Sequence, residues 1–209
     1  IGMQIMSSAG FNPNAMASFF ERLQKYSRLY DNNAPAYLRT HPLTTERIAD
    51  MQNRAANLSH KQVTDSMTFQ LMRTKLRVLN QIPTAAITEY TDAIHDKRYS
   101  SLTSVQYGLT LALMQAQHYN EAEAAYNKLV NLEIKNPIID SLGAKIKQNS
   151  GDIAGALQRY REARKRWPNY RPLVYNYADA MIKAGQPDEA IKLMTELITL
   201  YPDDYHLYQ

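Results

Sequence analysis

The side chains of this sequence that could ligate a metal or transfer a proton near neutral pH include five histidines, whereas cysteine is absent from the 209 residues. A zinc site of the His-Glu-x-x-His type needs two histidines four positions apart on one helix. No two of the five histidines have that spacing; they are His41, His60, His95, His118 and His206. We therefore expect residues 1–209 alone to hold no catalytic zinc and to cleave no peptide bond.

One histidine stands in a distinctive segment, because His41 lies within Thr-His-Pro and Arg47 follows shortly after it. An imidazole in such a loop could take the open coordination position of a metal ion, and a guanidinium could stabilise an oxyanion. The structural alternative is that His41-Pro42 forms a turn and that Arg47 pairs with an acidic neighbour. The residues alone favour the structural alternative.

Helices must position these side chains, since apolar residues recur at three- and four-residue spacing almost throughout the chain. Asn12-Pro13 predicts a helix start with Asn12 as the N-cap, and the helix should continue to about Leu29. The side chains that this helix should bury are Met16, Phe19, Phe20 and Leu23.

A polar loop over residues 31–42 precedes a second predicted helix, which should begin at Thr44 or Thr45. The side chains that it should bury are Ile48, Met51 and Ala55. The apolar pattern then weakens over residues 58–65, and we place a domain boundary there.

Beyond this boundary the sequence repeats itself. Four pairs of matching residues are 34 positions apart, namely Gly151 and Gly185, Ala156 and Ala190, Tyr160 and Met194, and Pro168 and Pro202. A period of 34 residues is that of the tetratricopeptide repeat, a helix–turn–helix unit. The residue types fit the unit: glycine suits the tight turn, a small residue suits a close helix contact, and proline ends the second helix.

The small residue recurs at Ala86, Ala122, Ala156 and Ala190, and its first interval is 36 residues instead of 34. The first repeat is therefore irregular. We predict an all-α fold, with helices that complete a preceding domain over residues 1–60 and a repeat solenoid over residues 61–209. The expected repeats cover about 67–102, 103–136, 137–170 and 171–204, with the start of a further repeat at 205–209.

The inner face of such a solenoid is lined by the first helix of each repeat. The groove positions of tetratricopeptide-repeat proteins, carried onto this sequence, imply a binding groove at Tyr107, Leu111, Met114, Lys145, Gln148, Asn149, Tyr175, Asn176, Asp179 and Lys183. This mixture of aromatic, amide and charged side chains suits an extended or partly folded polypeptide. The sequence thus predicts a protein-binding surface.

The charge pattern argues against nucleic acid as a partner, because 24 Lys and Arg against 20 Asp and Glu leave a net charge of only +4, spread along the chain. The one basic run is Arg161, Arg164, Lys165 and Arg166. It falls late in a second helix, which favours a solvated outer face over contact with an acidic partner or phospholipid headgroups. We find no membrane-length apolar run and no signal peptide, and expect a fragment cut at both ends.

Residues 1–23 and 40–48 resemble the C-terminal part of the zinc metallopeptidase domain of HtpX-like and CAAX-protease-like enzymes. The resemblance implies that residues 1–60 are the last helices of such a domain. It also implies that a His-Glu-x-x-His helix and a ligating glutamate precede Ile1, and that the intact protein binds zinc. His41 would then lie at the mouth of the zinc site as a regulator or ligand, with Arg47 beside it.

Joined to the repeats, this resemblance implies a periplasmic protease and chaperone of Gram-negative bacteria. Its partners would be outer-membrane β-barrel precursors and their assembly machinery, with peripheral membrane association as a further expectation. The alternative function is a non-catalytic scaffold that mediates protein–protein interaction. The two functions differ in whether a His-Glu-x-x-His motif is encoded upstream of Ile1.

Overall fold

The computed structural model describes residues 2–29, 45–58 and 64–202. Every regular element in these ranges is an α-helix, as the sequence predicts. The chain divides into two compact units, Ile1–Asp65 and Ser66–Gln209. The predicted loop at 31–42, the candidate residue His41, the candidate cap Thr44 and the further repeat at 205–209 lie outside the described ranges.

The described part of the first unit consists of three helices, α1 (Gly2–Ser8), α2 (Asn14–Leu29) and α4 (Thr45–Ala56). The predicted cap of α2 is confirmed, because the Asn12 side chain accepts a hydrogen bond of 2.9 Å from the backbone N–H of Asn14. Helix α4 packs against α2 and buries Ile48 and Ala55, both as predicted.

Of the four side chains that α2 was predicted to bury, Phe19 is exposed, and Met16, like Phe20 and Leu23, is only half-buried. Phe19 is 58% exposed, whereas the neighbouring Ala17 is 2% exposed. Successive helix residues turn by about 100°, so residue 19 lies roughly opposite residue 17. Phe20 and Leu23 lie between the two faces and are half-buried. The apolar spacing of this segment predicted a helix correctly, but it did not show which of its apolar side chains are buried.

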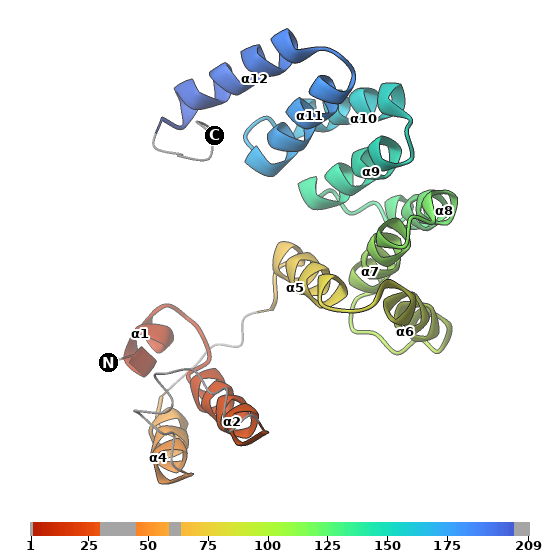
Figure 1. The fold of residues 1–209 in the computed structure, drawn as a ribbon. Helices are drawn as coiled ribbons and strands as arrows, with labels where there is room; N and C mark the ends of the chain where they lie inside the picture. Colours follow the sequence, from red (N-terminus) through yellow and green to blue (C-terminus); the bar gives the residue numbers. More distant parts are fainter. Residues whose placement is uncertain (1, 30–44, 59–63, 203–209) are drawn as a thin grey trace. The chain divides into compact units, whose positions relative to one another are not determined.

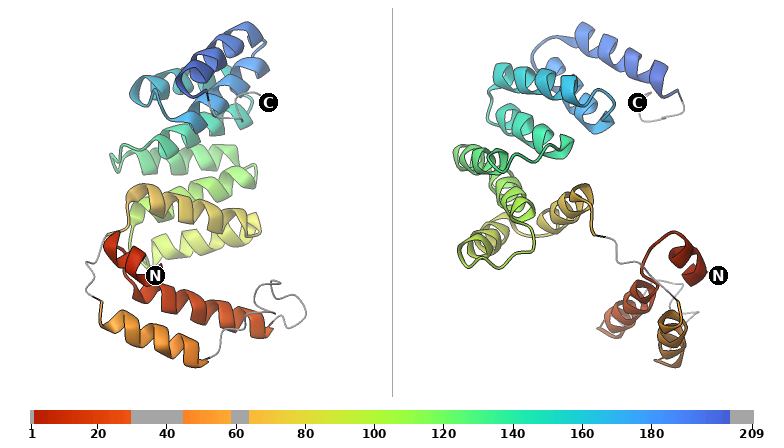
Figure 2. Two further views of the ribbon diagram at one scale, coloured as in Figure 1. Left: turned by 90° about the vertical axis from the view of Figure 1, so that its left-hand side faces the viewer. Right: turned by 180° about the vertical axis from the view of Figure 1, so that it is seen from behind.

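The described part of the second unit is a series of four helix pairs, drawn from yellow to blue in Figure 1. The pairs are α5 (Met67–Leu79) with α6 (Pro83–His95), α7 (Leu102–Gln115) with α8 (Tyr119–Val130), α9 (Pro137–Asn149) with α10 (Ile153–Arg166), and α11 (Arg171–Lys183) with α12 (Pro187–Leu200). Successive pairs stack on one another (Figure 2). The predicted all-α repeat solenoid is confirmed.

Each junction between pairs is filled by an aromatic ring from a second helix. The small residues that open the second helices, from Ala86 to Ala190, are at most 3% exposed. One turn further on, the ring of Tyr90 lies against Gly108 of the next first helix, and the ring of Tyr126 lies against Gly143. A Cβ atom at either glycine would overlap the ring, so these two helix–helix contacts require glycine.

The turns within the pairs also follow the repeat. Gly151 and Gly185 have positive φ angles of 89° and 73°, as their place in the turn predicts. One repeat earlier the same place is taken by Gln117, with a φ angle of 62°. A residue with a Cβ atom costs about 1–2 kcal/mol in this left-handed conformation. The sequence therefore tolerates strain at a turn that the later repeats build with glycine.

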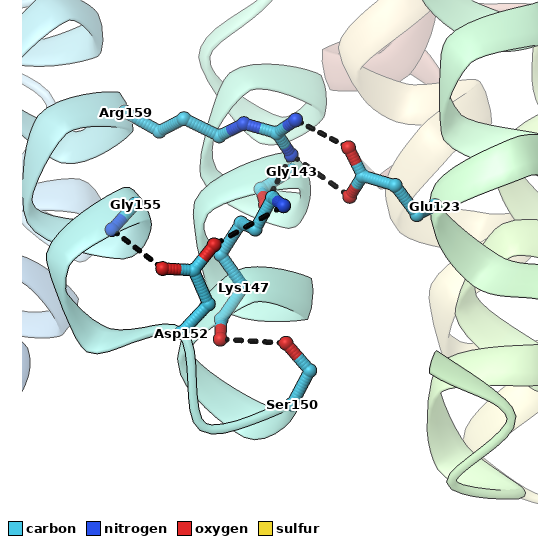
Figure 3. A network of polar contacts seen from close by, with 7 residues as sticks. All are labelled: Glu123, Gly143, Lys147, Ser150, Asp152, Gly155 and Arg159. Atoms are coloured by element: carbon cyan, nitrogen blue, oxygen red, sulfur yellow. Dashed lines mark hydrogen bonds and ion pairs between the residues drawn. The ribbon is translucent and has the colours of Figure 1, made fainter. Parts of the chain in front are cut away.

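A polar network adds to the junction of α8, α9 and α10 (Figure 3). The guanidinium of Arg159 donates to both carboxylate oxygens of Glu123 and, at 2.9 Å, to the backbone carbonyl of Gly143. Its Cζ also lies 5.2 Å from the ring centroid of Tyr126. One cation thus holds three helices together around the ring that fills their junction.

The same view shows how α10 begins. Asp152 caps the helix by accepting a 2.9 Å hydrogen bond from the backbone N–H of Gly155, and its other oxygen lies 3.2 Å from the Lys147 ammonium (Figure 3). The hydrogen bond from Gly155, with help from Lys147, lowers the pKa of the Asp152 carboxyl. The charged form of this cap is therefore the stable one at neutral pH.

Replacing Gly143 by valine should lower the free energy of unfolding by about 1–3 kcal/mol, because the new side chain must displace the Tyr126 ring. Helix propensity alone slightly favours valine over glycine, so a loss would report the clash. Urea unfolding followed by circular dichroism measures the effect. Ala124→Val, at an exposed position of α8, is the matched control and should cost less than about 1 kcal/mol. Equal stability of Gly143→Val and the parent chain would contradict this account of the junction.

Candidate functional site

The first helices of all four pairs share one cleft of about 180 Å³. Its walls are mainly apolar and aromatic, with a few polar groups and two lysines. The lining residues come from α5, α7, α9, α11 and the segment before α11: Met72, Lys75, Leu79, Tyr107, Leu111, Met114, Gln115, Ile138, Ser141, Leu142, Lys145, Tyr170, Pro172 and Asn176. This composition is typical of surfaces that bind other molecules.

Five of the predicted groove residues lie in this cleft. Tyr107, Leu111 and Met114 come from consecutive turns of α7 and are at most 9% exposed, so they form its floor. Lys145 is exposed on α9. Asn176 on α11 donates a hydrogen bond of 3.2 Å to the Ser141 hydroxyl. The structure therefore brings together residues from three of the predicted repeats.

Three other predicted residues form an internal network instead. The Gln148 side chain is 7% exposed, accepts a 3.0 Å hydrogen bond from the Tyr160 hydroxyl and donates one of 2.7 Å to Asp179. Lys183 lies 2.9 Å from the same Asp179 oxygen. The hydrogen bond from Lys183, followed by that from Gln148, lowers the pKa of Asp179. This network ties α9 and α10 to α11.

The last two predicted residues lie apart from the cleft lining. Asn149 is exposed at the end of α9, and Tyr175 is half-buried and packs against the core of the last two pairs.

The sequence analysis missed the contribution of α5, which supplies Met72, Lys75 and Leu79 to the cleft. The 36-residue offset of the first repeat hid the correspondence between α5 and the later first helices. A usable signal was present, because apolar residues at 69, 72, 76 and 79 follow helical spacing in addition to the buried positions 71 and 78.

The chemistry of the lining residues suits binding. Burial raises the pKa of the Tyr107 hydroxyl far above its ordinary value, so this group stays neutral. Lys75 and Lys145 form no ion pair within 4 Å in the described part of the chain, and they give the cleft a positive character. Apolar walls with unpaired cations complement a polypeptide segment that carries acid groups.

The described residues do not fit a zinc site. No group of three or more His, Cys, Asp or Glu side chains in these ranges could hold a metal ion. His95 and His118 are exposed and contact single carboxylates, Asp96 at 2.8 Å and Glu121 at 3.3 Å. Arg47 lies on α4 and lines a pocket of about 560 Å³ in the first unit.

The basic run on α10 is partly engaged in surface ion pairs. Arg164 lies 2.6 Å from Glu196, and Arg166 lies 3.5 Å from Asp140. Among the described helices, none combines the length and apolar character that a bilayer-spanning helix needs.

Comparison with known proteins agrees with this architecture. The profile of a family described as "Tetratricopeptide repeat" matches residues 149–209. A beta-barrel assembly-enhancing protease from Escherichia coli (strain K12) is 30% identical over 205 residues, which are 98% of this chain and 42% of that protein. The chain is a relative of the beta-barrel assembly-enhancing proteases. The expected kinship with a protease connected with β-barrel assembly is confirmed.

A second relative matches the same share of this chain. The beta-barrel assembly-enhancing protease of Yersinia pestis is 28% identical over 207 residues, again 98% of this chain and 42% of that protein. The chain thus spans less than half the length of these relatives. A solved structure of YrrB, described as a TPR protein with an unusual peptide-binding site, covers 69% of this chain and 90% of its own, at 14% identity and a TM-score of 0.31, which is too low to support an argument.

Gln148→Ala should lower the free energy of unfolding by about 1–3 kcal/mol, because it leaves the buried Tyr160 hydroxyl without its acceptor. Asn149→Ala is the matched control. Asn149 is the exposed neighbour of Gln148, so its replacement should change the free energy of unfolding by no more than about 0.5 kcal/mol. Thermal and urea unfolding of both variants provide the measurement. Two equally stable variants would show that the amide of Gln148 does not support the repeat junction.

Proposed function

We propose that the second unit is the recruiting part of a longer protease and binds polypeptide segments in the cleft between its first helices. Support comes from one observation above all: the cleft draws on α5, α7, α9 and α11, so it exists only when all four pairs are stacked. A surface assembled from four repeats can contact a partner segment over several of its residues.

The bound partners would be outer-membrane β-barrel precursors or the machinery that assembles them. The support is the kinship with proteins named beta-barrel assembly-enhancing proteases over 98% of this chain. The repeats would then hold a client near the proteolytic site of the intact protein and raise its local concentration there. This activity belongs in the periplasm, where such precursors pass before they reach the outer membrane.

The intact protein would be a zinc metalloendopeptidase, with the ligand-bearing helix in sequence that precedes residue 1. The resemblance of residues 1–23 and 40–48 to zinc metallopeptidases supports this assignment. His41 would regulate or complete the zinc site from a loop, and Arg47 would act beside it. A non-catalytic scaffold that mediates protein–protein interaction is the second candidate, supported by the four stacked helix pairs and the cleft that they share.

Photo-crosslinking in cells tests the recruiting surface. A photoreactive residue at Met72 or Lys145 of the full-length protein should form adducts with β-barrel precursors or their assembly machinery, because both positions line the cleft and are open to solvent. Lys128 and Thr195, exposed on second helices, are matched control positions and should give few adducts. Adducts from the second helices with silence at the cleft would place the binding surface elsewhere.

A separate measurement addresses the metal. Purified residues 1–209, dialysed against zinc, should retain well under one equivalent by elemental analysis and should not cleave casein. In the full-length protein His41→Ala should change proteolytic activity or zinc content, whereas His118→Ala, on the surface of the second unit, should change neither. If the His41 variant matches the parent protein in both properties, His41 has no role at the metal site.

A further inference from the structure

One face of α5 is both apolar and exposed. The exposed fractions are 50% for Phe69, 40% for Met72, 57% for Leu76 and 49% for Leu79. Their spacing of three, four and three residues aligns them in one row along the helix. The buried residues Leu71 and Val78 lie on a different face and fix the helix to its unit. The row is therefore a surface feature of a well-anchored helix.

The repeat explains why this row is open. In the next pair, the corresponding face of α7 receives the ring of Tyr90 at Gly108. Met72 precedes Gly108 by 36 residues, the same interval that separates the small residues of the first two repeats. Because α5 is the first helix described in the second unit, no second helix of that unit precedes it to cover Met72. The row has the geometry of a surface that accepts a helix.

Cations flank the row on both edges. Helix α5 carries Arg73, Lys75 and Arg77 and contains no acidic residue. A rotation of about 100° per residue puts Arg73 and Arg77 along one edge and Lys75 along the other. Arg77 lies 2.6 Å from Glu89, whereas Lys75 has no ion pair with any described residue. The surface therefore favours acid groups beside an apolar stripe.

The row continues into the cleft. Met72 and Leu79 belong to both, Lys75 at the edge of the row also lines the cleft, and Lys145 adds a second cation from α9. The side-chain oxygen of Gln115, in the same lining, is buried and has no hydrogen-bond partner among the described residues. It can accept a hydrogen bond from an N–H donor, and polypeptides supply such donors. The row and the cleft together therefore offer apolar contact, positive charge and a hydrogen-bond acceptor.

We propose that the occupant of this surface is an acidic amphipathic helix of a partner polypeptide, which lies along α5 in the position that a preceding second helix takes in the later pairs. Its apolar side chains contact Phe69, Met72, Leu76 and Leu79, and its carboxylates face Lys75 and Lys145. This inference rests on the proposed function and specifies the chemistry of the segment that the repeats recruit.

Two other occupants suit the observations less well. An anionic membrane is flat on this scale and cannot reach the buried acceptor of Gln115 in a concave cleft. A second copy of the chain, paired through the same face, would bring the two basic α5 helices together without acids to neutralise them. The partner is therefore a different polypeptide with the opposite charge.

Fluorescence anisotropy with the full 209-residue chain tests the proposal. The probe is a labelled peptide of about 14 residues, four helical turns, with leucine at heptad positions a and d and glutamate at the flanking positions. The control peptide keeps the leucines and replaces every glutamate by lysine. The acidic peptide should bind at least about tenfold more tightly at low ionic strength, and added salt should reduce the difference.

Variants of the chain locate the contact. Lys75→Glu combined with Lys145→Glu should reverse the preference between the two peptides. The matched control, Lys128→Glu with Lys192→Glu, changes the net charge equally but lies on second helices and should leave the preference intact. Leu76→Gln should weaken the acidic peptide about tenfold, whereas Ile191→Gln, also exposed, should not. Circular dichroism confirms that each variant is folded.

Several outcomes would overturn the inference. Three of them concern the peptides: equal binding of the two, no binding of either, or an unchanged preference after the lysine reversals. A doubled mass in sedimentation that Leu76→Gln abolishes would show that a second copy of the chain is the occupant. Leu76-dependent binding to phosphatidylglycerol vesicles, with no peptide binding, would show that a membrane is the occupant. A slow maleimide reaction at Leu76→Cys, compared with Ile191→Cys, would show that the row is already covered in the chain. Crosslinks from Met72 and Lys145 would still support recruitment in each case, so the two proposals can fail separately.

Discussion

The repeats of this protein are held together by large rings that enter spaces left by the next first helix. At the first two junctions the space exists because the receiving helix has glycine, Gly108 or Gly143, where any side chain would meet a tyrosine. At the third junction Tyr160 instead stacks on Tyr177, with ring centroids 5.8 Å apart and an angle of 28° between the planes. Two solutions thus serve one requirement, which is to fix the distance and rotation between neighbouring pairs.

The cleft depends on this packing. Its walls come from helices that are far apart in sequence, and only the junctions hold those helices at the spacing that brings Met72, Tyr107, Lys145 and Asn176 around one cleft. The polar network around Arg159 acts in the same direction from the second helices, because it joins Glu123 to the carbonyl of Gly143. The cleft and the junctions therefore share one frame, and lining residues such as Tyr107, Leu111 and Ile138 also belong to the packed core.

The sequence predicted the repeat well because the period leaves a mark at positions where chemistry is restricted. Ala86 and its counterparts must be small, and Gly151 and Gly185 must tolerate positive φ angles. Individual burial was harder, as Phe19 shows, because an apolar residue next to a buried face can lie on either side of it. Which face of a helix is buried depends on the helix that packs against it.

The candidate site was predictable only in part. The groove positions of the repeat family, carried onto α7 and α11, correctly gave Tyr107 and Asn176 as cleft residues. The same reasoning placed Gln148 in the groove, but the side chain of Gln148 is hydrogen-bonded to Tyr160 and Asp179 instead. Those partners are 12 and 31 residues away in sequence, so periodicity does not reveal them. Apolar spacing marks the row on α5 as one face of a helix, but it does not show that this face is exposed, because exposure depends on what packs beside the helix.

The left-handed residues in the connections have a consequence for how this fold can change over generations. Lys97, Gln117 and Glu133 each hold a positive φ angle, of 56°, 62° and 56°, at a cost that glycine would largely avoid. Exchanging one of these residues for glycine would raise the stability of the chain, and that gain could compensate for a destabilising mutation elsewhere. A destabilising substitution on an exposed first-helix surface could therefore be offset by the exchange of one of these turn residues for glycine. The strained turns thus leave the array room to change its exposed first-helix surfaces.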